Sequence, residues 1–290
     1  MENNTQLQPL IDGDLLVYEI SILGEFKEKG SEEVQIRHFS YLEEILVNRI
    51  EEICRAVGTK TPPIIYLTGK DNFRYKIAKK VAYKSNRKKD KPYHFYNVRE
   101  FLLSRYNATV VHGIEADDAM AIHQSSMSDT VICSRDKDLK QVPGWHYGWE
   151  VGEQPEYKLK WVNPLGMLYS QWESGISEKT GKETLSLKKV TGDGLRWFYY
   201  QTLVGDPTDT IPGLPGCGPK RALTLLEFCE TEKEMYEAVS EEYKIVYGDS
   251  WKEEMLEQAR LVWMVRTYNL DLTPKMWEIP DQWGNLNGCS

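Results

Sequence analysis

The chain has 290 residues, of which 41% are hydrophobic and 28% charged, and it contains nine Trp and 17 Tyr. This composition excludes a disordered or low-complexity protein, and no stretch approaches the 18 apolar residues that cross a membrane. The first residues lack the basic and apolar regions of a secretory leader. Five cysteines without CxxC spacing suggest neither a disulfide framework nor a zinc site. We therefore expect a soluble cytoplasmic protein without a membrane partner.

The net charge of −8 is unevenly distributed along the chain. Between residues 70 and 91 there are ten Lys or Arg against two Asp, which leaves a strongly acidic remainder. Because the basic residues are concentrated in one segment, the overall negative charge does not exclude a nucleic-acid partner.

Apolar runs alternate with helical periodicity through the first half of the chain. The run that ends at Asp12 predicts a strand, and the apolar spacing between residues 34 and 57 predicts a helix. Further strands are predicted at residues 62–69, 108–113 and 130–134, with helices at 92–107 and 115–127. Strands that alternate with helices predict an α/β fold with a mostly parallel central sheet flanked by helices.

The pattern is weaker in the second half. Residues 146–151 and 157–164 are predicted to pair as strands, and the polar, Gly-containing residues 174–194 are predicted to form a long surface loop. A helical run then meets a Gly/Pro-rich turn, and a second helix is predicted to start near Pro219. The tail over residues 231–271 is predicted to be helical.

Acidic residues recur where the predicted strands end. The carboxyl ends of parallel strands form the ligand crevice of an open α/β sheet, so these side chains are expected to converge. Carboxylates bind Mg²⁺ and Mn²⁺, and two such ions about 4 Å apart can activate water and stabilise a leaving oxygen. The acidic set is Asp12, Asp71, Glu115, Asp117, Asp118, Asp136, Asp138, Asp206 and Asp209.

Each acidic motif also has a structural interpretation when it is taken alone. The "EADD" run suits a helix N-terminus, where acids interact favourably with the helix dipole. The "RDKD" and "DGD" runs are typical of solvated turns. Only their joint placement at successive strand ends favours a metal site.

A second motif, "GLPGCGPKRAL", combines glycines with cations at a predicted helix start. Backbone N–H groups, the helix dipole and the cations could bind a phosphate together. This arrangement predicts a helix-hairpin-helix type turn that grips duplex DNA without reading sequence, and a plain connection between helices is the alternative. Its residues are Gly213, Gly216, Gly218, Lys220 and Arg221.

A third motif, "FRYKIAKKVAYKSNRKKDKPYHFY", interleaves basic residues with aromatic rings. Cations that track phosphates and rings that stack on bases suit single-stranded nucleic acid. A solvated basic helix is the alternative interpretation.

Five motifs, "IDG", "AYKSNR", "EADD", "SRDKD" and "GDPTDTIPGLPGCGPKRA", occur in the order seen in the flap endonuclease and 5′-3′ exonuclease family. Over residues 9–230 the chain resembles the compact bacteriophage members and the 5′-nuclease domain of bacterial DNA polymerase I. The resemblance implies a PIN-like catalytic domain over residues 1–192, with a basic helical arch at about 70–95. It implies a helix-hairpin-helix type DNA-binding subdomain with C-terminal helices over residues 193–290.

The resemblance also implies residue roles. The acids that would organise two Mg²⁺ ions, for which Mn²⁺ can substitute, are Asp12, Glu115, Asp117, Asp118, Asp136 and Asp138. Asp209 and, less directly, Asp206 would complete the second ion's site. Asp71 would precede the arch, in which Arg87 lies, Tyr83 stacks on a base and Lys84 contacts the scissile phosphate. The turn from Gly213 to Arg221 would bind duplex DNA and could hold a K⁺ ion.

The implied activity is that of a 5′-3′ exonuclease or structure-specific 5′ flap endonuclease, active in DNA replication, repair or recombination. It would leave 5′-phosphate products on DNA with a 5′ end, nick or flap, or on an RNA primer in a hybrid. We expect a monomer in the cytoplasm of a bacterial or phage-infected cell. One alternative is a structure-specific DNA-binding protein that does not cut, which would lack the carboxylates. The other is a PIN-type ribonuclease, which generally lacks the helix-hairpin-helix turn.

Overall fold

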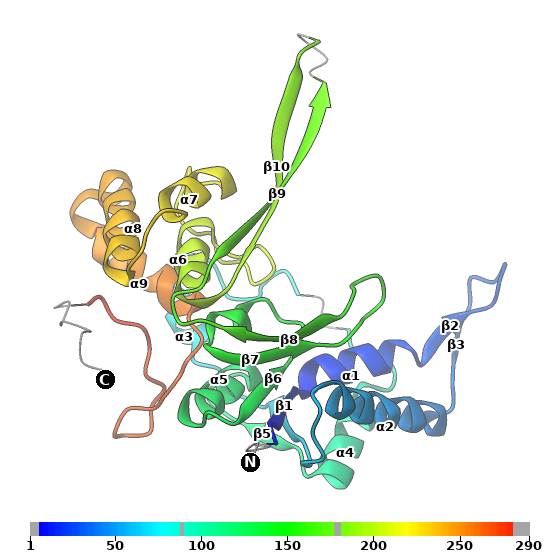
Figure 1. Ribbon diagram of the computed structural model, residues 1–290. Coiled ribbons are helices and arrows are strands. Elements are labelled where there is room, and N and C mark those ends of the chain that lie inside the picture. The colour runs from blue at the N-terminus through cyan, green and yellow to red at the C-terminus, as the bar shows by residue number, and fades with distance from the viewer. Residues whose placement is uncertain (1–5, 88–89, 177–180, 281–290) are drawn as a thin grey trace, which may run out of the picture. The chain divides into compact units, whose positions relative to one another are not determined.

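The computed structural model describes residues 6–87, 90–176 and 181–280 (Figure 1). Internal contacts divide the chain into two units. The first unit consists of the described residues of Met1–Phe73, Arg87–Val162 and Met264–Lys275. The second consists of the described residues of Arg74–Asn86, Asn163–Trp263 and Met276–Ser290. Each unit is therefore built from separate stretches of chain.

The first unit contains a six-stranded sheet in the order β5-β4-β1-β6-β7-β8. All neighbouring strands are parallel except β7 and β8, which are antiparallel. The predicted α/β class with a mostly parallel sheet is confirmed. The strands are β1 (Gln8–Asp12), β4 (Ile64–Thr68), β5 (Thr109–Val111), β6 (Thr130–Cys133), β7 (Gly144–Gly148) and β8 (Tyr157–Val162).

Helices cover both faces of this sheet because successive residues of its central strands point to opposite sides. Along β1, Ile11 packs into the core that also contains residues of α1, α2 and α4. Its neighbour Leu10 packs on the other side with Met120 and Ala121 of α5. These helices are α1 (Gly13–Ile22), α2 (Phe39–Ala56), α4 (Phe95–Tyr106), α5 (Ala116–Ser126) and the short 3-10 helix η1 (Asp138–Gln141).

The predicted strand end at Asp12 is confirmed, and one helix start in the first unit differs from the prediction. Helix α1 follows β1 directly because Asp12 ends the strand and also caps the helix, so no turn separates them. The helix predicted from residue 34 begins at Phe39, and the residues before it form β3 (Val34–Ile36), which pairs with β2 (Glu25–Lys27). Local apolar spacing does not show where a strand becomes a helix.

The second unit is mainly helical around an aromatic core. Trp197, Phe198 and Tyr199 pack there with Met235 and Met255. The predicted helix at Pro219 is confirmed, whereas the helical tail ends at Val262. The helices are α3 (Arg74–Ile77), α6 (Gly194–Val204), α7 (Pro219–Leu226), α8 (Glu232–Tyr247), η2 (Gly248–Ser250) and α9 (Trp251–Val262).

The prediction of a surface loop at residues 174–194 is wrong, because most of these residues belong to an antiparallel hairpin of β9 (Leu168–Ile176) and β10 (Glu183–Gly192). Figure 1 shows this hairpin as a long two-stranded ribbon. Most of its residues are exposed on both faces. Because neither face is buried along most of its length, the sequence lacks the apolar alternation that identifies a half-buried strand.

The helix predicted in the basic segment is short. Among the described residues from 70 to 94, only Arg74–Ile77 is helical, and Lys88 and Lys89 lie outside the described residues. Arg74 is fully buried, and its guanidinium donates to the backbone oxygens of Leu261 (3.1 Å) and Trp263 (2.6 Å) at the end of α9. This arginine stabilises a helix C-terminus. In the parts of the chain that the structure describes, no helix has the length and apolarity needed to span a bilayer.

Candidate functional site

Asp12 lies buried at the carboxyl end of β1. Its Oδ1 accepts the Leu15 backbone N–H (2.9 Å), which caps α1, and its Oδ2 accepts the Ser134 hydroxyl (2.7 Å). Gly13 allows the start of α1 to approach β4 closely, because a Cβ there would lie 2.5 Å from the Tyr66 carbonyl oxygen. The "IDG" motif therefore fixes one carboxylate at the strand end.

The electrostatic environment of Asp12 favours a cation. Burial, and then repulsion from Asp14, raises the pKa of Asp12 from 3.8 to about 7. Among the described residues, no cationic side chain forms an ion pair with it. A divalent cation would stabilise the ionised form and lower this pKa. Oxygen donors in such a setting fit a hard cation.

Hydrogen bonds of Thr68, at the end of β4, connect Asp14 with the N-terminus of α5. The Thr68 N–H donates to both Asp14 oxygens (3.2 and 3.0 Å), and Arg99 lies 3.5 Å from Asp14. The Thr68 hydroxyl accepts the Ala116 N–H (2.9 Å) at the start of α5. The carboxyl ends of β1 and β4 and the N-terminus of α5 therefore meet.

The acids of the "EADD" motif lie at the N-terminus of α5 and differ in their burial. Asp118 is fully buried, and its two oxygens accept the backbone N–H groups of Glu115 and Val265, each at 3.1 Å. Glu115 and Asp117 are partly exposed. Glu115 and Asp118 form a capping box at the start of α5, so the helix-capping interpretation describes both residues, and Asp117 is the partly exposed acid outside this box.

The "SRDKD" motif continues the network after β6. The Ser134 hydroxyl accepts the Asp136 N–H (2.9 Å), and Asp136 Oδ1 accepts the Asp138 N–H (2.7 Å). Asp138 also pairs with Lys137 at 2.8 Å. Asp136 contributes to the raised pKa of Asp12, so the two carboxylates interact. One serine hydroxyl thus joins the acids that follow β1 and β6.

Two residues of this network were not in the predicted set, Asp14 and Ser134. Ser134 could have been found from strand register, since Ile11 pairs with Cys133 and the next positions are Asp12 and Ser134. The predicted Asp71 and Arg87 are exposed in the first unit, and Asp71 has the left-handed backbone conformation (φ 66°).

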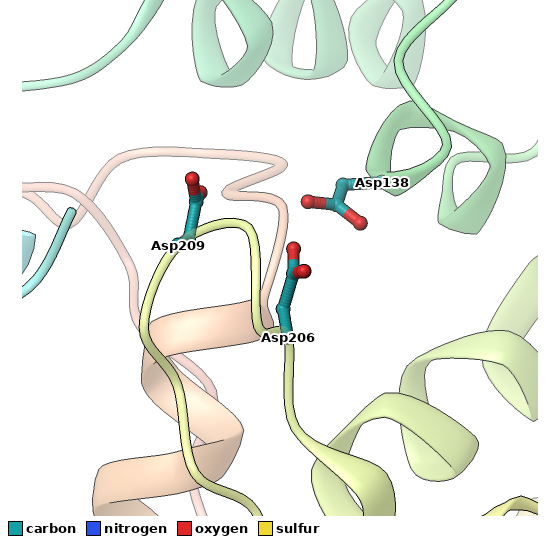
Figure 2. A group of neighbouring side chains, drawn as sticks. All are labelled: Asp138, Asp206 and Asp209. Atoms are coloured by element: carbon teal, nitrogen blue, oxygen red, sulfur yellow. The ribbon is translucent and has the colours of Figure 1, made fainter. Parts of the chain in front are cut away.

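In the second unit, Asp206 and Asp209 lie on the tight loop after α6. The Asp206 and Ile211 backbones exchange hydrogen bonds of 2.8 and 2.9 Å across it. Both aspartates are buried, and one carboxylate oxygen of each lies within 4.8 Å of the other. Figure 2 shows them on this loop and shows Asp138 at the start of its own helix. The loop presents two carboxylates from one short stretch.

Residues of the basic segment contact Asp209 within the same unit. The Tyr83 hydroxyl donates to Asp209 Oδ2 (2.9 Å), and the Lys84 N–H donates to the Asp209 carbonyl (2.9 Å). The Lys84 ammonium is 3.6 Å from Asp209 Oδ2. The structure thus brings the "AYKSNR" and "GDPTDT" motifs together.

The predicted duplex-binding turn leads into α7. Gly218 precedes the helix and Pro219 is its first residue, at the edge of a surface depression that also includes Lys220. Arg221 forms an ion pair with Glu242 (2.5 Å). A Cβ at Gly216 or Gly218 would meet nothing within 4 Å, so space is open in front of this backbone.

Sequence comparison identifies relatives of the chain. It is 27% identical over 221 residues to an exodeoxyribonuclease of Enterobacteria phage T3, which covers 72% of this chain and 63% of the phage protein. It is 32% identical over 117 residues to a 5′-3′ exonuclease of Streptomyces coelicolor, covering 40% of this chain and 33% of that protein. The chain is similar to a phage exodeoxyribonuclease and to a bacterial 5′-3′ exonuclease. The resemblance inferred from the motifs is confirmed.

The chain spans about 63% of the length of this phage relative. No family model matches it. Among solved structures, a variant of the phage T5 5′-exonuclease aligns over 88% of this chain and 86% of its own, with 13% identity and a TM-score of 0.46. A likeness at that level supports no conclusion about activity.

The raised pKa of Asp12 predicts a pH effect on the metal-free protein. Between about pH 4 and pH 7 the folded state binds a proton that the unfolded state has released, so this contribution to stability falls as pH rises. In EDTA, the Tm of Asp12→Asn minus the Tm of the parent is therefore expected to be larger at about pH 8 than at about pH 5. Asn still caps α1. Thermal melts at both pH values measure the difference, and an equal Tm difference at both would contradict the assignment.

Proposed function

We propose that the chain is a divalent-metal-dependent 5′ nuclease that hydrolyses DNA phosphodiesters at or near a 5′ end. The observation that carries this proposal is the buried Asp12, which has no described cationic partner and is joined through Ser134 to Asp136. The similarity to 5′-3′ exonucleases supports it.

Two Mg²⁺ ions are the proposed cofactors, and Mn²⁺ is expected to substitute. The proposed ligands contribute carboxylate oxygen only, which suits these hard cations. Bound ions would supply an activated water and stabilise charge on the leaving oxygen. The proposed ligand set is Asp12, Glu115, Asp117, Asp118, Asp136, Asp138 and Asp209, with Asp206 acting less directly.

Other residues of the chain would orient these carboxylates and the phosphate. Ser134 and the Leu15 N–H hold the two oxygens of Asp12 in place. Lys84 is proposed to contact the scissile phosphate and to stabilise the charge that develops there. The product would carry a 5′-phosphate.

The turn before α7 is proposed to grip the duplex backbone as a helix-hairpin-helix element and to hold a K⁺ ion on its backbone carbonyls. Gly218 supports this role, because it has an ordinary φ of −83° and open space where a Cβ would lie. Neither backbone strain nor packing requires glycine there. Close approach of a phosphate to the backbone N–H groups at the helix start would require it.

Gly218→Ala is expected to cost at most about 1 kcal/mol of stability, because Gly218 is the N-cap of α7 and Ala is a poorer N-cap. It is expected to weaken duplex DNA binding about tenfold, as for one lost hydrogen bond to a charged group. Thermal melts and fluorescence anisotropy with a labelled duplex in EDTA measure the two effects. Gly175→Ala is a matched control, because a Cβ there makes only an ordinary 3.8 Å contact. Equal DNA affinity for both variants would remove the support that Gly218 gives to the proposed grip.

The activity itself is tested with 5′-labelled blunt duplex, nicked duplex and 5′-flap substrates, each with Mg²⁺ and with EDTA. We expect Mg²⁺-dependent products bearing 5′-phosphates, with released mononucleotides indicating exonuclease and released flaps indicating endonuclease activity. An RNA/DNA hybrid tests the proposed action on RNA primers. Tight DNA binding without cleavage would favour the non-catalytic alternative, and cleavage of RNA but not DNA would favour the PIN-type ribonuclease.

A further inference from the structure

Tyr83 is a core residue of the second unit. Its side chain is 4% exposed and belongs to the same core as Trp197 and Phe198. The ring also makes an edge contact with Tyr75, at 5.5 Å between centroids. A ring that is packed on its faces by protein offers no face on which a nucleotide base could stack in this arrangement.

The hydroxyl of Tyr83 reaches the loop that carries the second pair of aspartates. It donates to Asp209 Oδ2 at 2.9 Å, and both residues are buried. The following residue, Lys84, has the left-handed conformation (φ 54°), and its N–H donates to the Asp209 carbonyl at 2.9 Å. Both the backbone and the side chain of Asp209 are therefore held by two consecutive residues.

Two further contacts run along the same pair of segments. The Ser85 N–H donates to the Thr210 hydroxyl (3.0 Å), and the Asn86 amide donates to the Pro207 carbonyl (2.9 Å). Residues 83–86 thus lie against residues 207–210. Such a set of contacts fixes the position of the Tyr83 hydroxyl relative to Asp209.

We propose that Tyr83 is a positioning residue that orients the Asp209 carboxylate for a divalent cation, and that it does not stack on a base. The inference rests on the proposed function, in which Asp209 is a metal ligand. A hydrogen bond from a buried hydroxyl to a carboxylate is charge-assisted, and it holds the carboxylate in one orientation. The aromatic ring serves to anchor that hydroxyl in the core.

The test uses Tyr83→Phe, which removes the hydroxyl and keeps the ring. Groups that orient metal ligands typically change metal affinity 10–100-fold, so we expect Mn²⁺ binding at one site to weaken by about tenfold or more. Calorimetric titration or Mn²⁺ electron paramagnetic resonance gives this value without an activity assay. Single-stranded DNA affinity in EDTA is expected to stay unchanged, because the buried ring does not stack on a base in the proposed role. Tyr75→Phe is the control, since Tyr75 is 60% exposed and has the same chemistry.

Asp209→Asn separates the proposed positioning role of Tyr83 from the proposed metal-ligand role of Asp209. If Asp209→Asn weakens Mn²⁺ binding and Tyr83→Phe does not, the positioning role is overturned and the metal site stands. If Asp209→Asn leaves Mn²⁺ binding intact, the proposed ligand set itself fails. A base-stacking role predicts the reverse pattern, in which Tyr83→Phe behaves as the parent and Tyr83→Leu loses single-stranded DNA affinity alone. Far-UV circular dichroism and Tm confirm that the variants are folded.

Discussion

Asp138→Ala is expected to reduce Mg²⁺-dependent cleavage of a 5′-flap substrate by about 100-fold or more, comparable to the loss of one preorganised charge-stabilising group. Asp138 starts η1, and its N–H is held by Asp136, so its carboxylate sits at a fixed place after β6. Single-turnover rates at saturating Mg²⁺ measure the effect. Thermal melts in EDTA are expected to show a folded protein, because the side chain is only partly buried.

Asp129→Ala is the matched control. Asp129 precedes β6 at its amino end, whereas Asp138 follows the carboxyl end of the same strand. Removing either residue changes the net charge equally, so a general electrostatic effect on DNA binding would appear in both variants. Full cleavage by Asp138→Ala would show that the metal mechanism proposed for this chain is wrong.

Gly213→Ala is expected to destabilise the second unit by about 3 kcal/mol or more and to lower Tm by several degrees. Gly213 has a φ of +68°, and a Cβ there would lie 2.4 Å from the Gly205 nitrogen. Gly205 itself has a φ of +71° and faces it across the neck of the loop that carries Asp206 and Asp209. The overlapping atoms belong to the backbone, so no side-chain rotation relieves them.

Gly216→Ala separates the cost of a positive φ from the cost of the overlap between backbone atoms. Gly216 also has a positive φ, of +77°, but a Cβ there would meet nothing within 4 Å. Its substitution is therefore expected to cost only the conformational strain, about 1 kcal/mol. Chemical denaturation of both variants gives the comparison, and equal destabilisation would mean that the crowded neck between Gly205 and Gly213 contributes nothing.

The central sheet could be predicted because its strands are short apolar runs with clear ends. The acids after β1 and β6 could be placed at one edge of the sheet for the same reason, since parallel strands end together. The hydrogen bonds that distinguish these acids could not be predicted. The buried Asp118 carboxylate accepts a hydrogen bond from the Val265 N–H, which lies 147 residues further along the chain.

Long-range packing also determines the structure of the basic segment over residues 70–94. Its cations and rings indicated a site for single-stranded nucleic acid, with a solvated basic helix as the alternative. Nothing local shows that Arg74 caps α9 or that Tyr83 enters the core that contains Trp197 and Phe198. The hairpin of β9 and β10 was missed for the opposite reason. Its residues make so few buried contacts that the sequence carries no periodic signal, although the backbone pairing is regular.

The discontinuous make-up of the first unit has a consequence for its synthesis. Residues Met264–Lys275 belong to this unit, where Met264 enters the core beside Leu10 and the Val265 N–H binds Asp118. On the ribosome, the unit therefore cannot complete its contacts until these residues have been made. A nascent chain released after residue 162 would contain the whole central sheet and still leave the buried Asp118 carboxylate without one of its donors. Assembly of this acidic edge is thus coupled to the synthesis of residues 264–275.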